Sequence, residues 1–340
     1  MLKHSREVTG GPGDGAGTLL AGVDIGGTKI AGAVVDREGG VVHRVQRPTP
    51  AGSGPEETFE AVASVLESLA AHPGWQRVAA VGIASAGPVD VERGTVSPVN
   101  IAAWRGFPVV ERTRALPAAA GLPVVLCGDA VAMTAAEHWV GAARGCRDAL
   151  CMVVSTGVGA GLVMDGVVRS GPTGNAGHLG HITVDLRGEP CACGSRGCVE
   201  QLASGTAITR NALRAGWRPA TGTADAAAVA AGARAGDSAA VAAFDTAARA
   251  LAAGIAAVAT LVEIEVAVIG GGVAEAHDVL FPPLRRHLRS YATLSFAAGV
   301  RVERAALRAD AGVVGAAFLA AGGRPVPGGH LSDAGCRLTG

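Results

Sequence analysis

The densest group of chemically active side chains lies near the centre of the sequence. His181, Cys191, Cys193 and Cys198 follow the spacing His-x9-Cys-x-Cys-x4-Cys. Imidazole nitrogen and thiolate sulfur are the donors of tetrahedral structural zinc sites, and glycines between the cysteines permit the turns that bring the sulfurs together. The pattern predicts one structural Zn²⁺ site. The alternative is a set of buried cysteines that bind no metal.

A second group of candidate residues follows an apolar run near the N-terminus. The run contains Asp24, and the turn after it carries Gly26, Gly27, Thr28 and Lys29. Paired glycines allow positive φ and let backbone N–H groups approach an anion, while a hydroxyl and an ammonium group can add contacts to phosphate. The carboxylate of Asp24 is placed to hold Mg²⁺ through water. The pattern predicts a phosphate-binding turn, and the alternative is an ordinary Gly-Gly hairpin.

The third candidate is Asp129, which stands at the junction of a predicted strand and a predicted helix. A carboxylate at such a junction commonly caps the helix. It can also act as the general base that accepts a proton from a hydroxyl nucleophile. One side chain can do both, so the position predicts neither role alone.

Strands and helices must position these groups. Apolar runs predict strands over residues 23–25, 31–35, 41–47, 78–84, 124–126, 149–154, 162–164 and 266–269. Apolar periodicity predicts helices over residues 55–71, 130–139, 277–288 and 310–319, and two packed helices within the Ala-rich stretch 222–250. Ser53 or Gly54 is the expected cap of the first helix.

Length and composition limit the class of protein. At 340 residues the chain is long enough for two domains, and its 29 basic and 29 acidic residues cancel, so a sequence-wide basic footprint for nucleic acid is missing. We identify neither a membrane-flanked apolar run of roughly 18 residues nor the apolar region of a secretory signal. Seven cysteines, three of them close together, indicate a metal site in a reducing compartment, with the cytoplasm as the default.

Residues 24–29 read Asp-x-Gly-Gly-Thr-Lys, which resembles the first phosphate motif of the actin-like ATPase fold. The form is that of sugar kinases of the ROK family (repressors, open reading frames, kinases). Four further motifs occur in the family's order, and the resemblance covers about residues 19–321. It implies an α/β protein with the two-domain actin-like ATPase (ribonuclease H-like) sugar kinase fold and an interdomain cleft.

The resemblance also implies how the chain divides. The expected parts are a disordered tail at 1–17, an N-terminal α/β domain at 18–128 completed by a C-terminal helix at 310–321, a larger α/β domain at 129–309 with the zinc loop 181–198, and a disordered tail at 322–340. Trp104 is expected to be a partly buried anchor rather than a platform on which the sugar stacks.

The family's binding residues map onto glycine-rich segments and the zinc loop. Residues 155–161 are expected to form a second phosphate loop, and residues 270–273 the adenosine loop. The implied ATP and phosphate contacts are Asp24, Gly26, Gly27, Thr28, Lys29, Thr156, Gly157, Gly159, Gly271 and Gly272. The implied sugar contacts are Gly87, Asn100, Asp129, His178, His181 and Glu200.

Two positions in the implied sugar site depart from the family pattern. Gly128 replaces an Asn, which leaves room and favours a hexose altered at carbon 3, such as kanosamine. His178 replaces the usual Glu, as in the bacterial N-acetylmannosamine kinases. A neutral His donates one hydrogen bond and accepts one, so its N–H could meet an acetamido carbonyl. We therefore expect an amino-hexose or a derivative to be preferred, with glucose accepted more weakly.

The implied activity is ATP-dependent phosphorylation of a hexose or amino-hexose at the 6-hydroxyl, with Asp129 as general base and Mg²⁺ on the phosphates. Plain glucokinase, N-acetylmannosamine kinase and kanosamine 6-kinase stay open as the specific activity. The other readings are a sugar-binding relative without catalysis, and a sugar-responsive regulator, for which a helix-turn-helix is missing. The expected partners are a small-molecule sugar and a nucleotide, not nucleic acid or membrane, and a second copy in a homodimer.

Overall fold

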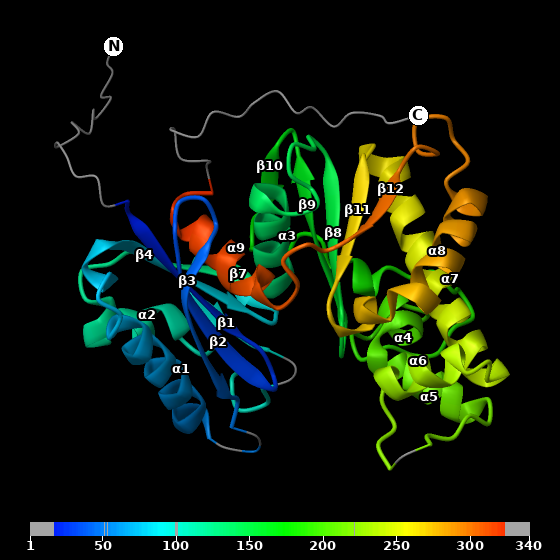
Figure 1. Cartoon of the computed structure of the whole chain (residues 1–340), viewed down its shortest axis with the longest axis horizontal. Helices are drawn as coiled ribbons and strands as arrows, with labels where there is room; N and C mark the ends of the chain where they lie inside the picture. Colours follow the sequence, from blue (N-terminus) through cyan, green and yellow to red (C-terminus); the bar gives the residue numbers. More distant parts are fainter. Residues whose placement is uncertain (1–16, 51, 53, 99–100, 221, 324–340) are drawn as a thin grey trace.

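The computed structural model describes residues 17–50, 52, 54–98, 101–220 and 222–323, and within them two five-stranded sheets carry the chain (Figure 1). The first sheet has the order β3-β2-β1-β4-β7, with β1 (Leu19–Ile25), β2 (Lys29–Val35), β3 (Val41–Pro48), β4 (Val78–Ser85) and β7 (Val124–Gly128). The second has the order β10-β9-β8-β11-β12, with β8 (Ala149–Val154), β9 (Val158–Met164), β10 (Val167–Arg169), β11 (Val266–Gly270) and β12 (Arg301–Arg304).

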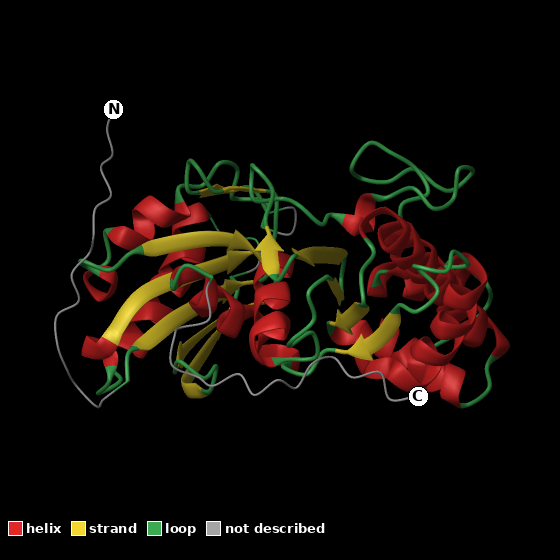
Figure 2. Cartoon of the chain, turned by 90° about the horizontal axis from the view of Figure 1, so that it is seen from above, coloured by secondary structure: helices red, strands yellow, loops and turns green. Residues whose placement is uncertain are grey.

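Helices form layers on both sides of each sheet. They are α1 (Pro55–Ala70), α2 (Val109–Arg114), α3 (Asp129–Val140), α4 (Val199–Ala203), α5 (Gly205–Arg214), α6 (Ala226–Arg234), α7 (Ser238–Val262), α8 (His277–Tyr291) and α9 (Ala311–Ala320). Figure 1 shows α3 and α9 between the two sheets, with α1 and α2 outside the first sheet and α4 to α8 outside the second. In the turned view of Figure 2 the helix-rich layer again lies at the right.

Parallel pairing brings several chain segments to one edge of the first sheet. Strands β1, β4 and β7 are mutually parallel, whereas β1, β2 and β3 form an antiparallel meander. The carboxyl ends of parallel strands lie at the same edge of a sheet. The segments that follow β1, β4 and β7 therefore meet at that edge. The strands β8, β11 and β12 are parallel in the same way in the second sheet.

Helix α9 is in close contact with the first sheet and with α3. A Cβ atom added to Gly22 of β1 would lie 1.9 Å from the carbonyl oxygen of Val313, and one added to Gly82 of β4 would lie 1.9 Å from that of Ala316. On the opposite side of the helix, a Cβ on Gly315 would lie 1.7 Å from the carbonyl oxygen of Ala132 in α3. The backbones thus touch where only glycine fits.

The core of the second half is built on α7, which packs against α4, α5, α6 and α8. Over 18 residues its mean hydropathy is 1.5, so by length and composition alone it could cross a membrane. However, 61% of that window is buried inside the fold. A helix that is apolar on most sides is expected in the core of a large domain, and that is where α7 lies.

The predicted strands and helices are found, with differences that have physical causes. Strand β9 begins at Val158, so the expected loop 155–161 is wrong in its second half. The glycines there are explained by packing against α3, because a Cβ on Gly159 would lie 3.2 Å from Ala130 Cβ and one on Gly161 only 2.4 Å from Thr134 Oγ1. Helix α3 begins at Asp129, with Gly128 as its N-cap residue.

Several short strands were not predicted, and some predictions concern residues that lie outside the described part of the chain. The hairpin of β5 (Val89–Asp90) and β6 (Thr95–Val96) was not predicted, nor were β10 and β12. The predicted tails were 1–17 and 322–340, of which 1–16 and 324–340 lie outside the described residues, as do Ser53 and Asn100. Trp104 is fully buried, and its indole nitrogen donates to the carbonyl oxygen of Pro55 at 3.1 Å, so it is an anchor as expected.

The contact of α9 with α3 gives a stability prediction. Replacing Gly315 with alanine raises helix propensity by about 1 kcal/mol. Its methyl group would nevertheless meet the Ala132 backbone, and we expect a net loss of about 1–3 kcal/mol in the free energy of unfolding. Chemical denaturation measures this. Gly299→Ala is the control, because an added Cβ there meets nothing within 4 Å. A Gly315→Ala variant as stable as Gly299→Ala would contradict the prediction.

Candidate active site and metal centre

The turn between β1 and β2 is held by hydrogen bonds to its own backbone and to Thr49. The N–H of Gly26 donates to the carbonyl oxygen of Lys29 at 3.0 Å, and the Thr49 hydroxyl donates to the carbonyl oxygen of Gly26 at 2.6 Å. Gly26 does not use the positive φ expected of it. A Cβ there would lie 3.1 Å from the Lys29 carbonyl oxygen, so the glycine permits a close turn instead. Thr28 is exposed at the tip.

Asp24 lies half-buried beside this turn, under the start of α9. A Cβ on Gly312 would lie 2.3 Å from Asp24 Oδ2, so the carboxylate fits only because Gly312 has no side chain. Burial and, to a smaller extent, the nearby charge of Asp129 raise the pKa of Asp24, and Lys29 lowers it, with a net value of about 7. A nearby cation would stabilise the ionised form of a carboxylate held in this way.

Asp129 is the first residue of α3, directly after β7. Its Oδ1 accepts a hydrogen bond from the N–H of Ala130 at 2.7 Å. Burial raises the pKa of Asp129, while the N–H of Ala130 and the charge of His178 lower it. The structure thus places Asp24 and Asp129 close enough to affect each other, at the shared carboxyl edge of β1 and β7.

The orientation of His178 bears on the expected contact with an acetamido group. Its Nδ1 lies 2.8 Å from the backbone carbonyl oxygen of Asn175, and a carbonyl can only accept, so Nδ1 carries the proton. A Cβ on Gly87 would lie 3.5 Å from His178 Nε2, which shows that Nε2 faces the segment after β4. In the neutral ring this nitrogen is an acceptor. In that neutral form, the single N–H of the ring is used by the Asn175 carbonyl oxygen.

The turn between β8 and β9 occupies the corresponding edge of the second sheet. The N–H of Ser155 donates to the carbonyl oxygen of Gly157 at 2.8 Å. Glu200, in the first turn of α4, accepts the N–H of Val158 at 2.9 Å through Oε2. The same oxygen would lie 2.6 Å from a Cβ on Gly157. One oxygen of Glu200 thus supports the turn that carries Thr156.

Gly271 and Gly272 lie next to this turn. Gly271 has φ of +88°, and a Cβ on it would lie 2.4 Å from the carbonyl oxygen of Val154. Gly272 begins the 3-10 helix Gly272–Ala276 and is close to Ser155 Oγ. Two glycine-containing turns therefore meet at the carboxyl ends of β8 and β11, where α/β folds bind ligands.

The four predicted metal ligands converge. One atom from each of His181, Cys191, Cys193 and Cys198 lies within 4.8 Å of the others. Cys193 Sγ is 3.8 Å from Cys198 Sγ, and Cys191 Sγ is 3.8 Å from His181 Nδ1. A tetrahedral ion about 2.3 Å from each sulfur would hold the sulfurs about 3.8 Å apart. The donor set therefore fits Zn²⁺ in both chemistry and spacing.

The surroundings of the cluster agree with a cation. Burial and the thiols of Cys191 and Cys193 raise the pKa of Cys198 to about 12. Three neighbouring thiolates are thus unfavourable unless positive charge lies between them. The side chain of Gln201 donates to Cys191 Sγ at 3.8 Å and can orient that sulfur.

Sequence reasoning missed two residues that shape this region. Gly312 makes room for Asp24, and its only signal is a glycine near the start of an apolar helix. Asn175 bonds to the backbone of Val89, and nothing in its local sequence indicates a partner 86 positions away. Both contacts arise from the tertiary arrangement.

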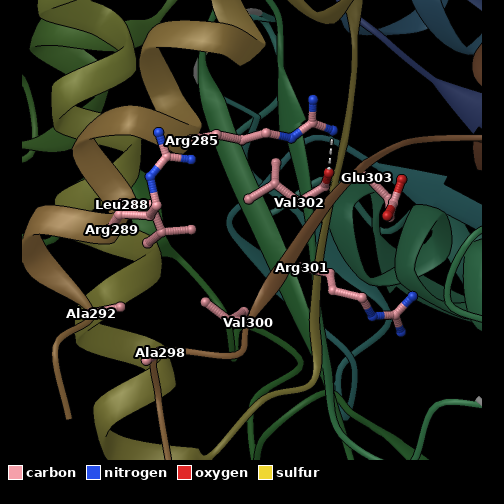
Figure 3. Close-up of a pocket in the computed structure, with 9 residues that line it drawn as sticks. All are labelled: Arg285, Leu288, Arg289, Ala292, Ala298, Val300, Arg301, Val302 and Glu303. Carbon is pink, nitrogen blue, oxygen red and sulfur yellow. Dashed lines mark hydrogen bonds between the residues drawn. The ribbon is translucent and has the colours of Figure 1, made fainter. Parts of the chain in front are cut away.

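A separate pocket of about 260 Å³ lies at the other end of the second sheet (Figure 3). It is lined by α8 and by the amino end of β12, away from the glycine turns. Arg285 donates to the carbonyl oxygen of Val302 at 2.7 Å, as the dashed line in Figure 3 marks. Because β12 is an edge strand, this arginine covers a backbone group that could otherwise pair with another chain.

Comparison with known proteins decides the family. The profile described as "ROK family" matches residues 20–322. The chain belongs to the ROK family. It is 37% identical to a glucokinase of Streptomyces coelicolor over 316 residues, which is 89% of this chain and 97% of the relative. It is 36% identical to an N-acetylmannosamine kinase of Citrobacter koseri, over 88% of this chain and 98% of the relative.

The fold comparison gives the same family. The structure of a ROK family glucokinase from Streptomyces griseus, in complex with glucose and AMPPNP, is 35% identical. It superimposes with a TM-score of 0.76 and covers 89% of this chain and 99% of that one. The two sheets with α3 and α9 between them are therefore the two-domain actin-like ATPase fold of ROK sugar kinases.

The raised pKa of Asp129 predicts how stability depends on pH. In the folded chain this group keeps its proton to a higher pH than in the unfolded chain, so its contribution to stability falls as the pH rises above about 4. Asp129→Asn removes the buried charge. We expect it to raise the melting temperature by a few degrees at pH 8 and to change it little at pH 4.

Asp165→Asn is the matched control with the opposite sign. The ion pair with Arg147 lowers the pKa of Asp165, so its loss should lower the melting temperature at pH 8. Equal shifts for the two variants at pH 8 would contradict the assignment of a buried, destabilising charge to Asp129.

Proposed function

We propose that this ATP-dependent sugar kinase transfers the γ-phosphoryl group of ATP to the 6-hydroxyl of a hexose, with Asp129 as the general base. The observation that carries the proposal is the position of Asp129. It lies at the carboxyl edge of the first sheet, within electrostatic reach of Asp24 on one side and His178 on the other. A buried carboxylate there can receive a proton close to the phosphate turn.

The proposed chemistry balances as follows. The sugar oxygen forms a bond to the γ-phosphorus, the bond from that phosphorus to the bridging oxygen breaks, and ADP leaves. The hydroxyl proton goes to Asp129. A raised pKa brings the base nearer to neutral pH, which improves proton transfer. When bound, Mg²⁺ supplies positive charge to the phosphates, and Asp24 is the residue that would hold it through water.

Three glycine-containing turns are proposed to hold the nucleotide. The β1–β2 turn, with Gly26, Gly27, Thr28 and Lys29, and the β8–β9 turn, with Thr156 and Gly157, would contact the phosphates. Gly271 and Gly272 would lie against the adenosine side, because they adjoin the end of β8. Gly159 is part of β9 and packs on α3, so a phosphate role for it rests on the family resemblance alone.

The sugar contacts are a proposal, and the acceptor at His178 limits which sugar substituents suit the site. A neutral Nε2 accepts hydrogen bonds, so it suits a hydroxyl or an amine on the sugar rather than an acetamido carbonyl. Gly128 leaves space, since an added Cβ there would meet nothing closer than 3.8 Å. We therefore propose a hexose or an unacylated amino-hexose as substrate. Gly87, His181 and Glu200 complete the proposed site.

Assembly and location also remain proposals from the family resemblance. They are a homodimer in the cytoplasm, with the chain divided near residue 128 into two domains that close on the sugar.

The proposed base gives the first kinetic prediction. Asp129→Asn keeps the shape of the side chain but cannot take the proton, and we expect kcat to fall by about 10²–10⁴. Binding of ATP and sugar, measured by calorimetry, should change little. If the variant keeps more than about a tenth of the wild-type kcat, Asp129 is not the base.

The sugar preference is tested by comparing kcat/KM in a coupled ADP-release assay. Glucose, glucosamine and kanosamine should each exceed N-acetylmannosamine and N-acetylglucosamine by about tenfold, a gap of about 1.4 kcal/mol. His178→Glu keeps an acceptor at this position and should keep that order. N-Acetylmannosamine as the best substrate would contradict the role given to Nε2. Turnover of none of the five sugars would contradict the proposed function itself.

The zinc proposal is tested by metal analysis. We expect one Zn²⁺ per chain, and a lower melting temperature after chelation, because structural zinc contributes folding free energy. Cys193→Ser should lose the metal. Cys151→Ala, which removes a buried thiol outside the cluster, should keep it. Wild-type protein without stoichiometric zinc, or a Cys193→Ser variant that retains it, would contradict the assignment.

A further inference from the structure

The side chain of Asn175 joins the loop after β10 to the small hairpin that follows β4. Its Nδ2 donates to the carbonyl oxygen of Val89 at 2.7 Å, and its Oδ1 accepts the N–H of Val89 at 3.1 Å. Val89 is in β5, which follows β4 of the first sheet. Asn175 is in the loop 171–178, which follows β10 of the second sheet. One carboxamide thus satisfies both backbone groups of a residue across the fold.

The geometry of the small hairpin explains why Val89 is available. Val89 pairs with Val96 in the antiparallel β5–β6 ladder. Val96 uses both its N–H and its carbonyl oxygen on Phe107, at 3.0 and 2.9 Å. Opposed residues in such a ladder either exchange both hydrogen bonds or neither. The polar groups of Val89 therefore point out of the hairpin, where Asn175 takes the place of a neighbouring strand.

The loop 171–178 is fitted against both parts. Gly174 has φ of +87°, and a Cβ on it would lie 2.4 Å from Val91 Cγ1 next to β5. Gly177 has φ of +90°, and a Cβ on it would lie 2.4 Å from the carbonyl oxygen of Ala160 in β9. The loop ends at His178, whose ring is held by the backbone carbonyl oxygen of Asn175. The position of Asn175 thus sets the position of His178.

We propose that Asn175 is a positioning residue that latches the loop 171–178 onto β5 and so holds His178 over the sugar. The inference rests on the proposed function, because it takes His178 and Asp129 as the sugar side of the site. Its two hydrogen bonds to Val89 exist only when the loop and the hairpin are together, whereas those from Nδ2 to the carbonyl oxygen and Oγ1 of Thr173 stay within the loop. When the loop and the hairpin separate, Asn175 and Val89 each bond to water instead. The latch therefore favours the closed arrangement.

A latch of this kind has a defined kinetic signature. A ligand that binds only the closed arrangement has an apparent affinity reduced by the fraction of closed molecules. Loss of the latch lowers that fraction and raises KM for the sugar. Saturating sugar closes the site again, so kcat should stay nearly the same. A residue that only supports the fold would instead lower the melting temperature and leave KM unchanged.

Three variants test the proposal. Asn175→Ala removes both hydrogen bonds to Val89 as well as those to Thr173 within the loop, and we expect the sugar KM to rise by about tenfold with kcat within about twofold of wild type. Asn175→Asp keeps the size and the acceptor but places a second oxygen beside the Val89 carbonyl. It should show the same direction of change even if the alanine variant folds poorly. Asn211→Ala on α5 is the matched control and should behave as wild type.

Hydrogen exchange supplies a readout that does not depend on activity. Deuterium uptake in peptides that contain the Val89 amide should be faster in both Asn175 variants than in wild type and Asn211→Ala. An unchanged KM or unchanged exchange at Val89 overturns the latch, as does a fall in kcat without a rise in KM. If wild type phosphorylates none of the sugars, the proposed function fails, while exchange at Val89 still decides whether the latch exists.

Discussion

The contact of α9 with its two neighbours is the constraint on which the rest of the structure depends. The helix lies against β1 and β4 on one side and against α3 on the other, with glycine at each point of backbone contact. Gly22, Gly82 and Gly315 are positions where any side chain would overlap a carbonyl group. Packing this close is rigid, because interiors are already filled to the density of organic crystals. It fixes α3, and therefore Asp129, relative to Asp24 in β1.

That rigidity explains how two carboxylates can stay close together in a partly dry environment. Burial disfavours the charge on each, and the charge of Asp129 adds to the cost at Asp24. The cost is opposed by the N–H of Ala130, by the charge of Lys29 and, in its protonated form, by His178. Sites that destabilise their own charged groups in this way are frequent where protons move or cations bind. The fold supplies the energy for this arrangement through its large apolar cores.

In the second half of the molecule, the metal ligands and His178 are held by loops rather than by packed helices. The metal-ligand cluster and the loop 171–178 flank the short 3-10 helix Leu179–His181, so His181 and His178 belong to one connected segment. One end of that segment is held by thiols and the other by Asn175. Loops are held on rigid elements in this way at many binding sites, since a loop alone loses too much entropy on ordering. The contact of α9 with α3 and the first sheet is rigid, whereas the loop segment is held by a few polar contacts.

The sequence by itself determined the features that depend on spacing along the chain. The metal ligands, the turn after Asp24 and the strand before Asp129 were predictable, because local patterns decide which elements form and which residues stand at their ends. The tertiary structure decided what each residue faces. It showed that Nδ1 of His178 donates to the carbonyl oxygen of Asn175 and that Gly159 serves packing on α3. It also showed that Asn175 bonds to Val89 in β5. These outcomes depend on atoms distant in sequence, whose approach is set by the packing of whole elements and leaves no local pattern.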